Sequence, residues 1–345
     1  MPSHERVTMA RIAELSGVSL STVSLVLRGR PGVGPETRQR VLEVARELGY
    51  LPPKLTAPYA PPLSSVGLIL KSDPGYVPQP NKFYSQVVAG IEEACRRQGI
   101  NLLYATLPVD EDSYPLDLPR ILTEEDSTGG LLLVGAFLNE ALRQVMDRHS
   151  VPVVLVDAYA AGGTYDAVVS DNLSGAYQAV TYLIRQGHRH IGLVGYHPSA
   201  YPSIEERRNG YQQALADQGI SDQYVAECHI VNPEEIAAAT AELLRSHPGL
   251  TAIFGVNDDV AVAVMEAARQ AGRRIPEDLS VVGFDDIELA GCVSPPLTTV
   301  HVDKVGMGRL AVQLLANRAE HPEASPVKAF ICPRLIERHS VCPPG

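Results

Sequence analysis

Apolar and polar positions change their spacing along this chain, and the first pattern covers residues 1–50. Between Val7 and Arg30, apolar residues recur every three or four positions on two short stretches separated by Gly17, which is typical of two amphipathic helices joined by a tight turn. Thr8 and Ser19 stand at helix N-cap positions, where a hydroxyl accepts a hydrogen bond from a free backbone amide. Residues 35–50 repeat the spacing after Pro35. The pattern therefore predicts three small helices around one core.

Each expected helix has an apolar face: Met9, Ile12, Ala13 and Leu15; Val23, Val26 and Leu27; and Val41, Leu42, Ala45 and Leu48. This leaves Leu20, Ser21, Thr22 and Leu25 facing outward on the second helix. Two helices across a tight turn form a helix-turn-helix, whose second helix enters the major groove of DNA. An ordinary helical hairpin has the same spacing, so the pattern alone leaves both interpretations open.

Proline dominates the next stretch, LPPKLTAPYAPPLSS, which spans residues 51–65. Proline lacks a backbone N–H and clashes with the preceding helical turn, so neither a long helix nor a central strand can pass through this stretch. We interpret residues 51–65 as a linker between a head, residues 1–50, and a body, residues 66–345.

In the body, short apolar runs alternate with amphipathic segments. The first series contains VGLIL, INLLYA, GGLLLVG and VPVVLVD, with helices over 83–98 and after Asn139; the second contains AVVSDN, HIGLVG, TAIFGVND and LSVVGFDD, with helices over 174–186, 205–218, 233–245 and up to Ala271. Buried parallel strands read as continuous apolar runs, with helices on both faces of the sheet. The pattern predicts an α/β fold with two similar lobes. A ligand cleft is expected beyond the carboxyl ends of their strands.

The charge distribution supports a separate role for the head. The chain of 345 residues has a net charge of −11, yet residues 1–60 carry eight Lys or Arg and five Glu, a balance of +3 that leaves −14 for the rest. A basic head attracts phosphates and an acidic body is repelled by them. A balance of +3 is small enough to be a chance excess.

Other features exclude several classes of protein. No apolar run approaches the roughly 18 residues that a membrane span needs, and the start MPSHERVTMA lacks the layout of a signal peptide. We therefore expect a cytoplasmic protein without a membrane partner. The five cysteines, Cys95, Cys228, Cys292, Cys332 and Cys342, are odd in number and form no CxxC, which favours buried thiols over a disulfide framework or a zinc site.

No catalytic motif is present. The sequence contains no GxSxG, GxxxxGK[ST] or HExxH pattern, so neither an enzyme nor a cofactor is expected. His188 and His190 fall on one side of a strand but lack a third ligand, so a structural role is more plausible for them than a metal site.

The head motifs T-x-x-x-I-A-x-x-S-G-V-S-x-S-T-V-S-x-V-L, P-E-T-R-x-R-V and E-L-G-Y-x-P resemble those of the lactose-repressor (LacI/GalR) family. The body resembles it in GIEEACRRQGINLL, VPVVLVD, SDNLSGAYQAVTYLIRQGHRHIGLVG, ERRNGYQQAL, TAIFGVNDDVAVAVMEAARQAGRRIPEDLSVVGFDDIELA and PPLTTV. The resemblance implies a three-helix head and a periplasmic-binding-protein-like body with two parallel sheets. Crossings between the lobes at PPLTTV and near Ala324 would give lobe 1 about 66–164 plus 298–324, and lobe 2 about 165–297 plus 325–345.

The same resemblance implies a function: a DNA-binding transcription regulator, in particular a repressor. It would bind an approximately palindromic operator as a homodimer and respond to a small polar effector such as a sugar. The residues expected at the DNA are Thr8, Ser19, Leu20, Ser21, Thr22, Leu25, Arg28, Arg30, Thr37, Arg38 and Tyr59. Among these, Ser19, Thr37 and Arg38 are expected to meet phosphates.

Two positions of the DNA-binding region depart from the family pattern. Leu25 stands where the family commonly has an arginine that reads guanine; leucine has no donor, so either Arg28 or Arg30 compensates or that base is not read. The family's hinge helix, A-R-S-L, is replaced by Thr56, Ala57, Pro58 and Tyr59. Proline inside a helix costs about 3 kcal/mol, so hinge docking is doubtful, and Tyr59 is either a minor-groove wedge or an exposed linker residue.

The effector site is expected where strands end. Asp171, Asn257 and Asp285, each next to a second Asp or Asn, could hold the hydroxyls of a neutral sugar or nucleoside, although Asp and Asn serve equally well as helix N-caps. Arg207 falls in the first turn of a helix expected from Glu205, where the helix dipole disfavours a cation. It could pair with Asp285 or a ligand oxygen, or with Glu205 or Glu206.

By resemblance, Arg207, Asn257 and Asp285 correspond to effector contacts of the family. Phe83 and Tyr84 would form a stacking wall, although Lys82 replaces the proline of the family's N-P-F-F. The full expected set is Phe83, Tyr84, Asp171, Arg207, Asn257 and Asp285. Two alternatives stay open: a solute-binding or sensor protein with a vestigial DNA head, suggested by Leu25 and the altered hinge, and a Rossmann-like enzyme.

Overall fold

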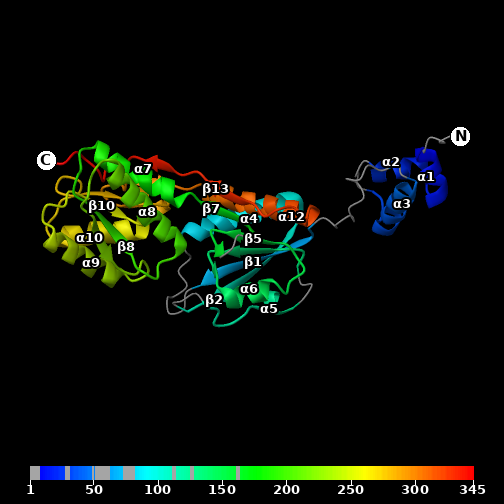
Figure 1. The fold of residues 1–345 in the computed structure, drawn as a ribbon, viewed down its shortest axis with the longest axis horizontal. Coiled ribbons are helices and arrows are strands. Elements are labelled where there is room, and N and C mark those ends of the chain that lie inside the picture. The colour runs from blue at the N-terminus through cyan, green and yellow to red at the C-terminus, as the bar shows by residue number, and fades with distance from the viewer. Residues whose placement is uncertain are drawn as a thin grey trace. The chain divides into compact units, whose positions relative to one another are not determined.

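The computed structural model describes residues 8–27, 32–48, 50, 63–72, 82–110, 114–124, 128–160 and 164–345. The chain divides into two compact units, residues 1–62 and 63–345 (Figure 1). Each unit has its own apolar core. The predictions for Arg28, Arg30, Pro58 and Tyr59 lie outside the described residues.

The first unit contains three helices: α1 Met9–Ser16, α2 Leu20–Leu27 and α3 Pro35–Glu47. Thr8 caps α1 through a hydrogen bond from the Arg11 amide, and the Ser19 hydroxyl accepts one from the Thr22 amide at 3.1 Å. Gly17 has φ 68° and ends α1 in the left-handed conformation that glycine adopts without strain. The two helices meet at 108°. The predicted helix-turn-helix is thus confirmed.

The core of this unit consists of Ile12, Val23, Val26, Val41 and Ala45. Leu15 was expected in this core, but it is 49% exposed. The buried positions of α1 are Ile12 and Ser16, four residues apart, and Leu15 lies at the edge of this buried face. The Ser16 hydroxyl donates to the Ile12 carbonyl, which satisfies a polar group inside the core.

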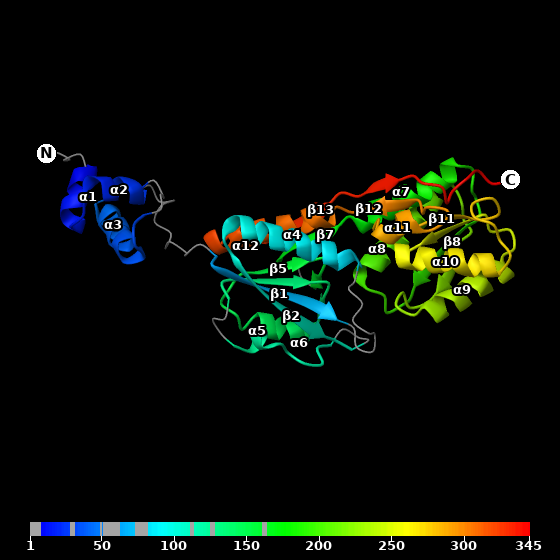
Figure 2. The same ribbon diagram turned by 180° about the vertical axis from the view of Figure 1, so that it is seen from behind.

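The first lobe of the body has a six-stranded parallel sheet in the order β13-β7-β5-β3-β1-β2. The strands are β1 Ser65–Ser72, β2 Asn101–Pro108, β3 Leu131–Val134, β5 Val153–Val156, β7 Asp166–Ser170 and β13 Lys328–Ile331. Helices α4 Lys82–Gln98 and α12 Lys304–Glu320 cover one face, and α5 Arg120–Thr123 and α6 Glu140–Met146 cover the other (Figures 1 and 2). Two separate apolar clusters fill the two sides of the sheet.

The second lobe has a four-stranded parallel sheet in the order β11-β10-β8-β9. Its strands are β8 Ile191–Tyr196, β9 Tyr224–Glu227, β10 Ala252–Gly255 and β11 Ser280–Val282, and its helices are α7 Asn172–Arg185, α8 Pro202–Asp217, α9 Pro233–Ser246, α10 Asp258–Gln270 and α11 Glu288–Cys292. Two small pairs complete the body: β12 Thr299–His301 with β14 Arg334–Ile336, and β4 Phe137–Leu138 with β6 Tyr159–Ala160. The predicted α/β fold with two parallel sheets is confirmed.

The sheet order corrects the expected lobe boundaries at two strands. The boundaries near residues 165 and 325 would place β7 and β13 in the second lobe, yet these strands pair with each other at one edge of the first-lobe sheet. The chain leaves the first lobe after Ser170, returns to it between β12 and α12, and leaves it again after Ile331. The apolar pattern could not show this, because parallel strands of both sheets read alike.

No single helix among the described residues is long and apolar enough to cross a membrane. Among the described residues, α1 and α2 reach the length and apolar character of a membrane span only when they are counted together, and they are bent by 108° at the break between them.

Candidate functional site

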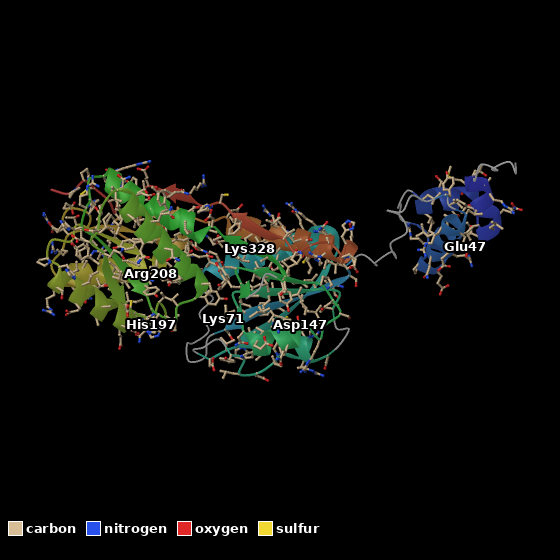
Figure 3. The ribbon with its side chains drawn as sticks, in the orientation of Figure 1. Glu47, Lys71, Asp147, His197, Arg208 and Lys328 are labelled. Carbon is tan, nitrogen blue, oxygen red and sulfur yellow. The ribbon has the colours of Figure 1, made fainter. Side chains whose placement is uncertain are left out.

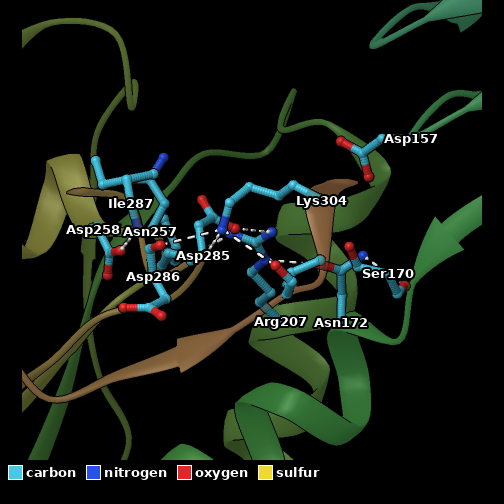
Figure 4. Close-up of polar contacts among 12 residues, drawn as sticks. Asp157, Ser170, Asn172, Arg207, Asn257, Asp258, Asp285, Asp286, Ile287 and Lys304 are labelled. Carbon is cyan, nitrogen blue, oxygen red and sulfur yellow. Dashed lines mark hydrogen bonds and ion pairs between the residues drawn. The ribbon is translucent and has the colours of Figure 1, made fainter. Parts of the chain in front are cut away.

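Arg207 is the centre of a buried polar network at the carboxyl ends of the second-lobe strands. Its Nε donates to Asn172 Oδ1 at 2.9 Å, Nη1 to the Val256 carbonyl at 2.8 Å and Nη2 to Asp285 Oδ1 at 3.0 Å (Figure 4). The guanidinium also stacks 3.8 Å from the centre of the Phe284 ring. Of the partners that the sequence left open, the structure shows Asp285.

The position of Arg207 in its helix differs from the expected one. Helix α8 begins at Pro202 and not near Glu205, so Arg207 lies beyond the first turn and the helix dipole gives no reason for its placement. The nearby Glu205 pairs with Arg208 instead. Burying the guanidinium costs free energy, which is offset by the hydrogen bonds that it donates to three acceptors. These bonds also fix the plane of the group.

Asp285 and Asp286 form a turn directly after β11 with φ of 104° and 52°. Residues other than glycine seldom adopt these angles, so the surrounding structure must hold the turn. Buried Lys304 donates its ammonium to the carbonyls of both residues (Figure 4). The Asp286 carboxylate turns the other way and accepts hydrogen bonds from Arg338 at 2.5 Å and from His301 at 2.8 Å.

The electrostatics of this turn follow from burial. Burial raises the pKa of the Asp285 carboxyl, and the charges of Arg207 and Lys304 oppose that rise. Burial lowers the pKa of Lys304, and the Asp285 charge opposes that shift. Burial also favours a higher pKa for Asp286, but hydrogen bonds from Arg338 and His301 outweigh it, so its pKa lies below the usual value. The turn connects the Arg207 network to His301 of β12 and to Arg338, which follows β14.

Two of the expected effector residues serve as helix caps. Asp171 Oδ1 accepts from the Ser174 amide at 3.1 Å, and Asn257 Oδ1 accepts from the Val260 amide at 2.8 Å. These are the capping roles that the sequence left open. Both side chains are partly exposed, so capping does not by itself exclude a ligand contact.

The neighbours of these caps are buried. Asn172, next to Asp171, is the residue that contacts Arg207, although the sequence pointed to Asp171. Asp258, next to Asn257, accepts hydrogen bonds from the Ile287 amide and the Thr299 hydroxyl, and burial raises its pKa to about 8. Asp258 is fully buried and therefore holds the fold.

The first lobe contributes Phe83, Tyr84 and Asp157. The two aromatic rings meet edge to face at 5.2 Å, and the Tyr84 hydroxyl donates to Asp157 Oδ2 at 3.0 Å. The other oxygen, Asp157 Oδ1, is buried without a hydrogen-bond partner among the described residues, and Figure 4 shows this side chain apart from the bonded network. Burial raises the pKa of Asp157 to about 6, although the charge of Arg207 opposes the rise.

The sequence analysis missed Asp157. The residue follows the strand VPVVLV directly, as Asp171 and Asp285 follow theirs, so the same strand-end rule applied to the first lobe would have found it. Ser170, at the end of β7, also has a buried hydroxyl without a partner among the described residues.

Tyr159 joins the two lobes. Its hydroxyl donates to Glu206 Oε2 at 3.2 Å and accepts from Asn172 Nδ2 at 3.0 Å. Its ring meets the Tyr201 ring edge to face at 5.7 Å. Glu206 and Tyr201 belong to the α8 region that carries Arg207, so Tyr159 links the first lobe to that region.

Aromatic and basic side chains surround Tyr201. The Phe137 ring lies 6.5 Å from it, edge to face, and Lys71 Nζ lies 5.2 Å from its centre. Lys328 Nζ lies 5.4 Å from the Tyr159 ring. Figure 3 labels Lys71 and Lys328 on the first lobe. Another contact between the lobes is the exposed ion pair of Lys82 and Asp259 at 3.1 Å.

This arrangement suits hydrogen bonding of a ligand. It combines the carboxylates of Asp157, Glu206 and Asp285 with amide and hydroxyl groups beside aromatic rings. Within the described ranges, no group of three His, Cys, Asp or Glu is arranged to hold a metal ion. His188 instead contacts Thr251 Oγ1 and the Cys342 carbonyl, and His190 contacts the Tyr224 hydroxyl.

On the head, the structure places most of the expected DNA-contacting residues at the surface. Leu20 and Leu25 are 53% and 38% exposed. Thr8, Ser19 and Ser21 are also exposed, while Thr22 and Thr37 are partly exposed. Arg38 is only 7% exposed, which leaves little of it available to a phosphate in this arrangement.

Comparison with known proteins agrees with the geometry of both units. Residues 8–53 match the model of bacterial regulatory proteins of the lacI family, and residues 180–341 match the periplasmic binding protein-like domain. The chain is 31% identical over 338 residues to the HTH-type transcriptional repressor PurR of Vibrio atlanticus, with 97% of this chain and 98% of the relative covered. The chain belongs to the lacI family.

Other lacI-family relatives extend the likeness. The ribose operon repressor of Haemophilus influenzae is 32% identical over 338 residues, with 97% of this chain and 98% of the relative covered. The solved structure of the transcriptional regulator CelR in complex with cellobiose has a TM-score of 0.69 and 29% identity, and covers 97% of this chain and 100% of its own.

Membership of the lacI family decides between the classes considered above. The relatives are transcriptional repressors, so the expectation that the protein is a DNA-binding regulator and not an enzyme is confirmed. As a lacI-family protein, it combines a DNA-binding head with a body that takes a small effector.

Proposed function

We propose that this lacI-family regulator acts in the cytoplasm as a repressor and binds an approximately palindromic operator as a homodimer. A small neutral polar effector, a sugar or a nucleoside, binds between the lobes and controls DNA binding. The observation that carries the proposal is the buried cluster in which Asp157 Oδ1 has no partner among the described residues while Arg207 and Asp285 are fixed opposite. A buried acceptor of this kind favours a ligand that donates a hydrogen bond.

The charges at the site favour a neutral ligand. The charges of Asp285 and Glu206 both raise the pKa of Asp157, and the guanidinium of Arg207 already donates hydrogen bonds to protein groups. An anionic ligand would meet repulsion from three carboxylates. Hydroxyl groups of a sugar or nucleoside can donate to them instead. Support for this class comes from the cellobiose complex of one relative.

Control of DNA binding needs an effector that prefers one arrangement of the lobes. The site draws Tyr84 and Asp157 from the first lobe and Arg207 and Asp285 from the second, so a ligand that contacts both sets binds the closed arrangement better. The contacts made by Tyr159 and Glu206 would tighten in the same state.

The dimer contact is proposed at the free edge of the first-lobe sheet. Strand β2 is the last strand in the sheet order, and it exposes Leu103 and Tyr104. An open groove of about 870 Å³ lies beside it, lined by residues of α4, β2 and the turn between them, which include Val88, Ile100 and Leu102. Exposed apolar side chains on a sheet edge invite a partner, and two-fold symmetry would place the same patch on both subunits.

The effector site is tested by thermal unfolding of the full chain in the presence of a panel of sugars and nucleosides. We expect at least one compound to raise the melting temperature, because a ligand present at 100 times its Kd stabilises by about 2.7 kcal/mol. Arg207→Ala should abolish this shift, since it removes the group that orients Asn172 and Asp285.

The matched control is Arg208→Ala, one residue further along α8, where the guanidinium lies over the Tyr196 ring and pairs with Glu205. This variant should keep the shift. Circular dichroism of the unliganded Arg207→Ala variant shows whether it is folded, and Arg207→Lys serves in its place if it is not. A full ligand shift in a folded Arg207 variant would contradict the assigned site.

A further inference from the structure

The DNA-reading helix α2 has an unusual composition. Its eight residues, LSTVSLVL, consist of leucine, serine, threonine and valine only. Guanine and adenine are read in the major groove mainly by paired hydrogen bonds from arginine, lysine, asparagine or glutamine. No side chain of α2 can form such a pair, so this helix must recognise bases by other contacts.

The outward surface of α2 carries two exposed leucines beside its hydroxyl groups. Val23 and Val26 fill the core of the head, whereas Leu20 is 53% exposed and Leu25 is 38% exposed. Leu20 is the first residue of the helix and Leu25 lies about one and a half turns further along. Leucine on the surface that meets DNA contributes nothing to phosphate binding, so its contribution must come from apolar contact with the bases.

The hydroxyl groups at the start of α2 are already engaged with one another. Ser19 Oγ lies 2.7 Å from Ser21 Oγ and 2.8 Å from Thr22 Oγ1, and it also accepts from the Thr22 amide. A hydroxyl has one proton to donate. These internal contacts limit the number of hydrogen bonds that the three side chains can offer to base edges.

We infer that α2 recognises thymine through its C5-methyl group, with Leu20 and Leu25 as the residues that determine this specificity. Among the four bases only thymine presents a methyl group in the major groove. The inference rests on the proposed function and specifies the kind of operator, with A·T pairs under α2. Discrimination at each such pair is expected to be about fourfold, the value for one buried methyl group, compared with roughly 5- to 150-fold for a paired hydrogen bond to the correct base.

The test uses the full chain. Duplexes that bind are selected from a random library, and each thymine of the selected half-site is then replaced in turn by uracil, which lacks only the methyl group. We expect the affinity of the wild type to fall about fourfold at one or more thymines. Leu20→Ser or Leu25→Ser should remove that loss at the thymine which the leucine contacts.

The matched control is Leu15→Ser, which makes the same change at a leucine 49% exposed on the neighbouring helix α1. It should leave every effect of uracil unchanged. If no replacement by uracil weakens the wild type, or if both α2 variants keep all of its losses, the inference is wrong while specific DNA binding stands. A selection that enriches no sequence would contradict the proposed function as well.

Discussion

At the scale of single residues, Asp157 has a buried carboxylate oxygen to which a ligand can donate a hydrogen bond. Its side chain is buried, one oxygen accepts from Tyr84, and the other has no partner among the described residues. Burial of a charge without full hydrogen bonding destabilises the fold, and such positions are concentrated at functional sites. The raised pKa of Asp157, about 6, is the measurable sign of that cost.

Asp157→Asn tests this interpretation through the pH dependence of stability. Because the folded-state pKa is raised from 3.8 to about 6, the folded protein holds a proton that the unfolded chain releases, and stability falls as pH rises from about 4 to about 6. The loss amounts to about 3 kcal/mol for two pKa units. The asparagine variant should lack this loss and be the more stable protein above pH 6, as measured by urea unfolding.

The same variant should bind the effector less tightly, because an amide replaces the stronger charged acceptor. Asp117→Asn, at an exposed position, is the control and should change neither quantity. Equal pH dependence in wild type and Asp157→Asn would show that Asp157 does not carry the raised pKa.

The sequence left Asp285 as one of several possible partners of Arg207, and it did not indicate the residues that hold Asp285. The strand-end rule identified Asp285, and the guanidinium needed a carboxylate. Lys304 lies on a helix that follows a crossing between lobes, and its carbonyl contacts depend on the left-handed turn at Asp285 and Asp286. Neither the turn nor the burial of Lys304 leaves a local pattern in the chain.

At the scale of elements, each lobe depends on a close pair of helices. In the first lobe, α4 and α12 approach at Gly90 and Gly308: a Cβ on Gly308 would lie 2.2 Å from the Val87 carbonyl oxygen, and one on Gly90 would lie 2.2 Å from that of Val305. In the second lobe, a Cβ on Gly210 of α8 would lie 2.3 Å from the Leu173 carbonyl oxygen of α7. Glycine at these crossings lets the backbones touch.

Gly308→Ala should therefore destabilise the body. The added methyl group meets backbone atoms that cannot rotate away, so we expect a loss of roughly 1–3 kcal/mol in the free energy of unfolding, as for overpacked cores. Urea unfolding measures it.

Gly291→Ala is the matched control, since Gly291 also lies in a helix, α11, but an added Cβ there has no atom within 4 Å. It should leave stability unchanged or raise it by about 0.4–1 kcal/mol. Equal stability of the two variants would refute the close packing of α4 on α12.

The elements themselves were largely predictable, but their membership of a sheet was not. Caps and apolar spacing located α1, α2, α6 and α7 within a few residues. The strands β7 and β13 were assigned to the wrong lobe, because the place where a chain crosses between two similar sheets depends on tertiary packing. The resemblance to the family implied that the chain crosses between the lobes more than once. The strand order of the two sheets shows where these crossings lie.

At the scale of the whole molecule, the two units have different chemistry. The head recognises DNA with a helix that exposes two leucines, and the body holds a hydrogen-bonding network around Arg207 that Tyr159 extends into the first lobe. The turn at Asp285 and Asp286 contacts His301 of β12 and Arg338, two residues beyond the end of β14, so ligand contacts at Asp285 are connected with the segments that link the lobes.

The most direct test of the central claim is a titration of the full chain with three labelled duplexes at one salt concentration: the selected palindrome, its single half-site and a scrambled sequence. We predict that the palindrome binds at least about 10³-fold more tightly than the scrambled duplex, that the half-site is much weaker, and that the compound found by thermal unfolding changes palindrome affinity roughly 5- to 150-fold. Equal affinity for the palindrome and the scrambled duplex, with or without that compound, would contradict an effector-controlled, sequence-specific regulator.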